Sequence, residues 1–198
     1  MQTMLIYKYA ELYKQGYTDI DTDFETSIIE YCEWFEPLPD SRKKQLPRLL
    51  PIYRKLPGEL FWRAFGCTWA WCYDTWPHRR PLLSLLNRHH RCSPARKHDD
   101  EEPITIYRGC SSRRVRAVSW TTNRRIAEEF AAGHLDFKVP NPVIATAQIE
   151  RKDVFDYDNG QDEDEVIANP AGLRCLEVKR PSPRELESYK KRPPGLTG

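Results

Sequence analysis

Two glutamates just before a short apolar segment are the residues of this sequence best suited to do chemistry. Glu163 and Glu165 lie in the acidic stretch at 159–165 and are followed directly by the apolar residues 166–168. At the start of a β-strand, residues i and i+2 point to the same face of the sheet. Two carboxylates on one face repel each other unless a cation lies between them or they take part in acid–base chemistry. This pair therefore predicts the position of an active site.

Two shorter polar segments precede the glutamates, and each lies in a stretch with the composition of a β-strand. Residues 107–109 read Tyr-Arg-Gly, and residues 119–121 read Ser-Trp-Thr. A guanidinium on a strand can bind a diphosphate or a carboxylate through two parallel hydrogen bonds. If these strands pack into one β-sandwich, Arg108, Ser119 and Glu165 would line one cleft, where the carboxylate could stabilise a cationic transition state.

The order of these segments resembles the arginine–serine–glutamate class of ADP-ribosyltransferases, which includes the clostridial binary toxins and the arginine-specific vertebrate ectoenzymes. The matching segments are IYRG at 106–109, SWTT at 119–122 and EDEVI at 163–167, and AEEFA at 127–131 stands where this family places a helix. The resemblance covers roughly residues 104–180. It implies a mixed β-sandwich core and NAD as the donor substrate, with no metal. The diphtheria-like class would need a histidine where Arg108 stands.

Carried over residue by residue, the resemblance implies a role in NAD binding for most of these side chains. Arg108, with Gly109 beside it, would contact the phosphate and ribose of NAD. Ser119 would hydrogen-bond Glu165 and hold its rotamer, with Thr121 as a supporting hydroxyl. Glu165 would bind the 2'-hydroxyl of the nicotinamide ribose and stabilise the oxocarbenium ion that forms as nicotinamide leaves.

The remaining residues of the motifs are expected to act on the acceptor or to complete the NAD site. Glu163 would serve the acceptor as a base or an anchor, and a glutamate at this position goes with arginine as the acceptor in this family. Asp162 and Asp164 add negative charge, which favours a cationic acceptor. Trp120 stands in the middle of the second motif and joins the expected NAD-binding set.

Aromatic residues outside the motifs have two candidate roles. Phe130 and Phe137 could stack on nicotinamide, since the family places an aromatic residue in the loop after this helix, but we interpret both as core or loop residues. The segment at 58–76 is rich in Trp and Phe. We interpret this segment as a helix packed on the core rather than as a recognition surface.

The predicted elements divide the chain into a helical subdomain at 1–100, a β core at 101–181 that carries the motifs, and a flexible tail at 182–198, which makes an α+β protein. Pro47 and Pro51 are expected to break a basic helix at 40–56. A helix at 124–132 should begin at the capping residue Asn123 and end at Gly133. Helices are also predicted at 2–15, 22–35, 58–76 and 82–88, and strands at 104–107, 117–121, 143–149, 154–157, 166–168 and 173–178.

Composition limits the class of protein. With 31 Lys and Arg against 29 Asp and Glu, the net charge of +2 is too balanced to predict nucleic-acid binding. The sequence shows no apolar run of the roughly 18 residues that span a bilayer and no secretory signal. We therefore expect a cytoplasmic protein without membrane contact, in the producing cell or in a target cell after delivery. The six cysteines form no Cys-x-x-Cys pair, which favours reduced thiols over a metal site.

The functional hypothesis is a mono-ADP-ribosyltransferase that modifies a macromolecule, with arginine on a protein as the favoured acceptor, in a toxin, an effector or a phage-borne modifier. Three alternatives stand beside it. The enzyme could be a toxin that hydrolyses NAD without an acceptor. It could modify RNA or DNA, contacted by the basic stretch at 88–97 and the basic tail. It could also be a non-catalytic module whose helical half binds a partner, an inhibitor or a target.

Overall fold

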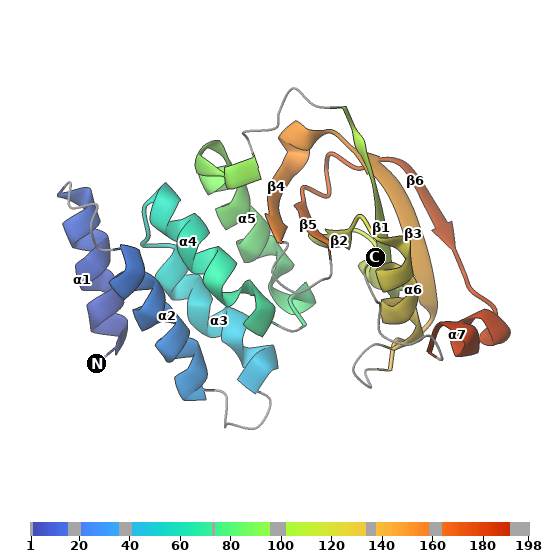
Figure 1. The fold of residues 1–198 in the computed structure, drawn as a ribbon, viewed down its shortest axis with the longest axis horizontal. Helices are drawn as coiled ribbons and strands as arrows, with labels where there is room; N and C mark the ends of the chain where they lie inside the picture. Colours follow the sequence, from blue (N-terminus) through green and yellow to red (C-terminus); the bar gives the residue numbers. More distant parts are fainter. Residues whose placement is uncertain are drawn as a thin grey trace. The chain divides into compact units, whose positions relative to one another are not determined.

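The computed structural model of this chain describes residues 2–15, 21–35, 41–72, 74–95, 102–133, 138–158 and 164–190. It divides into two compact units, Met1–Ser93 and Pro94–Gly198. The first unit is built from helices, and the second contains a β-sheet with two α-helices, so the fold class is α+β (Figure 1). In the described part of the chain, every helix is too short or too polar to cross a membrane.

In the described residues of the first unit there are five α-helices, and their buried faces form its core. A cluster of aromatic residues lies in this core: Tyr53 meets Phe61 edge-on at 5.4 Å between ring centroids, and Phe65 stacks on Trp69 at 4.9 Å. The indole N–H of Trp62 donates to the carbonyl of His89 at 2.8 Å. The Trp-rich segment therefore packs inward, as predicted. The helices are α1 (Gln2–Lys14), α2 (Asp21–Phe35), α3 (Ser41–Tyr53), α4 (Gly58–Thr68) and α5 (Arg79–His89), with 3-10 turns at Trp69–Trp71, Trp76–His78 and His90–Cys92.

The prediction that prolines break the third helix was wrong. Helix α3 runs without interruption from Ser41 to Tyr53 with Pro47 and Pro51 inside it. Each proline removes one backbone hydrogen bond. Burial of apolar side chains along α3, including Leu46 and Leu49, outweighs this loss, because tertiary packing supplies most helix stability in proteins.

The second unit contains one six-stranded sheet, in which every described pair of neighbouring strands runs antiparallel. The spatial order of its strands is β4-β5-β2-β1-β3-β6. The three strands that carry the predicted motifs, β5, β2 and β1, are therefore neighbours in the middle of the sheet. The strands are β1 (Ile104–Ser111), β2 (Ser119–Thr121), β3 (Pro142–Ile149), β4 (Val154–Asp158), β5 (Glu165–Ala168) and β6 (Arg174–Lys179).

Strand β1 pairs very differently with its two neighbours. It is longer than the predicted 104–107 and pairs with β3 along its whole length, from Ile104 opposite Ile149 to Ser111 opposite Pro142. With β2 it shares a single register position, Tyr107 opposite Thr121. The ladder between β1 and β2 therefore stops after one pair, at the centre of the sheet.

Helix α6 (Arg124–Ala132) has the bounds that its capping residues predict. The Asn123 side chain accepts a hydrogen bond from the Arg125 backbone N–H at 3.0 Å, and Gly133 ends the helix in the left-handed conformation with φ 101°. The helix lies along β1 (Figure 1). This close approach depends on Gly109, because a Cβ there would stand 1.7 Å from the carbonyl oxygen of Ala127.

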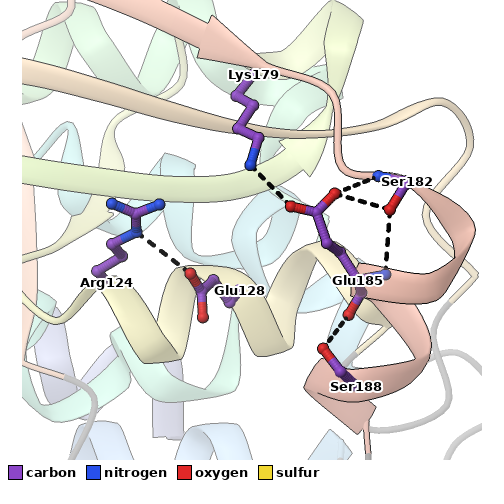
Figure 2. A network of polar contacts seen from close by, with 6 residues as sticks. All are labelled: Arg124, Glu128, Lys179, Ser182, Glu185 and Ser188. Carbon is purple, nitrogen blue, oxygen red and sulfur yellow. Dashed lines mark hydrogen bonds and ion pairs between the residues drawn. The ribbon is translucent and has the colours of Figure 1, made fainter.

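Residues 183–190, which the sequence assigns to a flexible tail, instead form helix α7 (Pro183–Lys190). Ser182 and Glu185 make a reciprocal capping box, in which the carboxylate accepts from the Ser182 N–H at 2.7 Å (Figure 2). The Lys179 ammonium donates to the same carboxylate at 2.8 Å, and these bonds lower the pKa of Glu185 to about 2. Tyr189 is buried against α6 and β3. The rest of the predicted tail, 191–198, lies outside the described residues.

We predict that Gly109→Ala will strongly destabilise the second unit. The new methyl group would collide with backbone atoms of α6, which cannot move without displacing the whole helix, so we expect a loss of about 3 kcal/mol in the free energy of unfolding. Denaturant unfolding followed by circular dichroism measures this loss. The control is Gly66→Ala in α4, where no atom lies within 4 Å of the added Cβ. That variant should gain about 0.5–1 kcal/mol, and equal stability of both variants would contradict the prediction.

Candidate functional site

A pocket with a volume of about 130 Å³ lies between the centre of the sheet and helix α6 in the second unit. Strands β1, β2 and β5 and helix α6 all contribute to its lining. The pocket collects every predicted site residue that the structure describes, while Glu163 lies outside the described residues. The lining residues are Tyr107, Arg108, Gly109, Ser119, Trp120, Thr121, Ile126, Ala127, Phe130 and Glu165.

Arg108 joins β1 to β2 at the point where their ladder stops. Its Nε donates to the carbonyl of Arg114 at 3.2 Å, and its Nη1 donates to the carbonyl of Ser119. Antiparallel continuation of the ladder would place Ser119 opposite Gly109, two residues beyond the last pair. The guanidinium therefore satisfies a carbonyl that would otherwise bond to a strand backbone, and it holds the two strands beside the pocket.

The guanidinium of Arg108 lies in a buried and strongly polar environment. Burial lowers its pKa, while the Cys110 sulfur, which accepts a hydrogen bond from it, and the Glu165 carboxylate raise it. Burial also raises the pKa of the Cys110 thiol, and Arg108 opposes this effect. Since an arginine stays protonated even when its pKa falls, the pocket wall carries a fixed positive charge that interacts with the carboxylate of Glu165.

The register of β2 against β5 shows which hydroxyl lies opposite the glutamate. Thr121 is directly opposite Glu165, whereas Ser119 is opposite Ile167. Directly opposed residues have Cβ atoms about 4.5–5.5 Å apart, and diagonal neighbours are about 7–8 Å apart. Thr121 is therefore the nearer hydroxyl by register.

Two residues predicted to bind NAD have packing roles in the structure. The Trp120 side chain is buried in the core of the second unit, and its indole N–H donates to the Ala117 carbonyl at 2.9 Å. Gly109 lies against the backbone of α6, as described above. Both residues touch the pocket, and both determine its shape through the core and the helix rather than through a side chain that reaches into it.

Sequence reasoning did not assign Tyr107 and Ile126 to the site. Both are half-buried and line the pocket together with Phe130, for which stacking on nicotinamide was the alternative to a core or loop role. Ile126 and Phe130 are spaced i, i+4 and so lie on one face of α6. This spacing is the signal that could have identified the helical wall. Phe137, the other residue with this alternative, lies outside the described residues.

The arrangement suits a ligand with a flat ring and a developing positive charge. Tyr107 and Phe130 supply aromatic surface, Glu165 supplies a carboxylate, and Arg108 supplies a fixed positive charge in the lining of the same pocket. Groups of three or more His, Cys, Asp or Glu side chains that could hold a metal are absent from the described residues.

Comparison with known proteins leaves the chain without a family assignment. Neither the protein-family models, nor the curated proteins, nor the solved structures contain a significant match to this sequence or fold.

We predict that Arg108→Lys will lower the free energy of unfolding of the second unit by about 1.5–3 kcal/mol, the range for hydrogen bonds to charged groups. Lysine keeps the charge, but one ammonium cannot donate to the carbonyls of both Arg114 and Ser119 in the geometry of the guanidinium fork. Denaturant unfolding measures the loss.

The matched control is Arg113→Lys, at an exposed position in the 3-10 turn Ser112–Arg114. This exposed substitution should change the free energy of unfolding by less than about 0.5 kcal/mol. If Arg108→Lys is as stable as Arg113→Lys, the guanidinium does not hold the two strands together.

Proposed function

We propose that this protein is an NAD-dependent mono-ADP-ribosyltransferase of the arginine–serine–glutamate class, with its active site in the second unit. One observation carries the proposal: Arg108, Ser119 and Glu165, which come from three separate sequence motifs, line a single pocket on three neighbouring strands. Under this proposal, the antiparallel sheet with α6 beside it is a variant of the sandwich core of that class.

The pocket would take the nicotinamide-ribose end of NAD. Its volume of about 130 Å³ is below the roughly 300–1,000 Å³ of typical small-molecule sites, so the adenosine end would lie outside it. The nicotinamide ring would pack against Tyr107 and Phe130. Arg108 would keep β1 and β2 in place beside the ribose and supply positive charge on the side of the diphosphate.

Glu165 would promote the departure of nicotinamide. The bond between the ribose C1' and the nicotinamide nitrogen breaks, its electron pair leaves with the now neutral nicotinamide, and the ribose carries the positive charge. A carboxylate that hydrogen-bonds the 2'-hydroxyl lies close to this charge and stabilises it. An acceptor nucleophile then forms a bond to C1' and loses its proton.

The acceptor would be an arginine side chain on a protein, with Glu163 as the residue that binds or deprotonates it. The support comes from the sequence: the i, i+2 pair of Glu163 and Glu165 accompanies arginine as acceptor in the class that the chain resembles. Such an activity fits a toxin, an effector or a phage-borne modifier.

We predict that Glu165→Gln will lower the kcat of nicotinamide release from NAD by about 10²–10³-fold, because the amide cannot stabilise the cationic transition state. The KM for NAD should change little. Chromatographic measurement of released nicotinamide gives both constants. The control is Glu177→Gln on the exposed face of β6, which should match wild type. Wild-type turnover in Glu165→Gln would show that the site is assigned wrongly.

We predict that Glu163→Ala will keep the hydrolysis of NAD but lose transfer to arginine, since its role concerns the acceptor alone. Biotinylated NAD and a cell lysate, followed by mass spectrometry of the labelled species, measure transfer, and nicotinamide release measures hydrolysis. Equal loss of both activities would remove the acceptor role of Glu163.

The same labelling experiment separates the alternatives. Labelled RNA or DNA would identify a nucleic acid as the acceptor, and nicotinamide release without any labelled species would identify a NAD hydrolase. If wild type shows no turnover and no heat in titration calorimetry with millimolar NAD, the chain is a partner-binding module and the proposal fails.

A further inference from the structure

Asn123 connects three of the four elements that line the pocket. Its backbone N–H donates to the Thr121 hydroxyl in β2 at 3.0 Å, and its Oδ1 accepts from the Arg125 N–H at the start of α6 at 3.0 Å. Its Nδ2 donates to the carboxylate of Asp164, the residue just before β5, at 3.3 Å. A helix cap needs only the Oδ1 bond, so the contact with Asp164 goes beyond capping.

Asp164 has a backbone conformation that few residues adopt. Its φ of 46° lies in the left-handed region, where Asn and Asp are tolerated best after glycine. Its carbonyl accepts from the Thr122 N–H at 3.0 Å, which extends the pairing of β2 with β5 by one position beyond Thr121 and Glu165. The conformation of Asp164 thus determines where Glu165, the next residue, enters the sheet.

We propose that Asn123 and Asp164 form a positioning pair that sets the location of Glu165 relative to β2 and α6. The pair ties the residue just before β5 to the capped start of the helix that carries Phe130, so the carboxylate of Glu165 and the aromatic wall of the pocket keep a fixed separation. This inference rests on the proposed role of Glu165 in NAD cleavage. Asn123 and Asp164 are positioning residues and do not touch the reacting atoms.

An exchange of the two side chains tests the pair. In Asn123→Asp, the new carboxylate still caps α6 but faces the carboxylate of Asp164 and repels it. We expect kcat for nicotinamide release to fall roughly 10- to 100-fold, as small displacements of catalytic groups do, while KM and the unfolding midpoint stay close to wild type. In Asn123→Asp/Asp164→Asn, donor and acceptor are reversed and both residues still suit their backbone conformations, so kcat should recover to near wild type.

The matched control is Asn169→Asp, the same substitution at the other end of β5. The Asn169 Oδ1 accepts from the Ala171 N–H at 3.1 Å, and a carboxylate preserves that bond. This variant should keep wild-type kcat. If Asn123→Asp is as active as Asn169→Asp, or if the exchanged variant is no more active than Asn123→Asp, the positioning role is refuted.

A second measurement does not depend on catalysis. Hydrogen–deuterium exchange of the Thr122 amide reports its bond to the Asp164 carbonyl directly. Protection of this amide should fall in Asn123→Asp and return in the exchanged variant. If wild type releases no nicotinamide, the proposed function fails while this measurement still decides the pair: unchanged protection in Asn123→Asp would overturn it.

Discussion

The structure of the second unit depends on Arg108, which joins the two central strands β1 and β2 although their backbones pair at only one position. A sheet whose ladder stops in its interior leaves backbone carbonyls without partners, and buried carbonyls without partners are costly. The guanidinium supplies several donors in one rigid plane and reaches the carbonyls of Arg114 and Ser119 together. The same guanidinium therefore supplies hydrogen-bond donors at the gap in the ladder and places a buried positive charge there.

The buried charge of Arg108 in turn constrains its surroundings. A desolvated cation is stabilised by groups that carry negative charge or accept hydrogen bonds, and Cys110 and Glu165 are the groups that raise the pKa of Arg108. The positive charge of Arg108 thus stabilises the carboxylate of Glu165 in the pocket even before any ligand binds. A substrate that develops positive charge would compete with Arg108 for the carboxylate of Glu165. The proposed chemistry and the packing therefore both use this carboxylate to stabilise a positive charge.

Close contacts at strand and helix ends help to set the dimensions of the pocket. Gly109 lets α6 lie directly on β1, and Asn123 connects the start of α6 to β2 and to the residue just before β5. Such contacts tolerate little variation, since a backbone cannot rotate away from a collision as a side chain can. The residues that shape the pocket therefore lie in short segments around the ends of strands.

Much of the local structure could be read from the sequence because it depends on neighbouring residues. Helix α6 runs from Arg124 to Ala132 between its caps Asn123 and Gly133, since capping and left-handed termination are local effects. The pattern of apolar residues located all six described strands approximately. The capping box of Ser182 and Glu185 was also readable, but the Pro- and Lys-rich composition around it concealed α7.

Contacts between residues that are far apart in the sequence could not be predicted in this local way. Burial kept α3 intact across two prolines, the antiparallel register placed Thr121 rather than Ser119 opposite Glu165, and the close approach of α6 made Gly109 a packing residue. Residue types and their order thus identified which side chains could share a site. Strand pairing across more than forty residues decided which of these side chains face one another. This is because register depends on the whole buried surface of a sheet and not on any one segment.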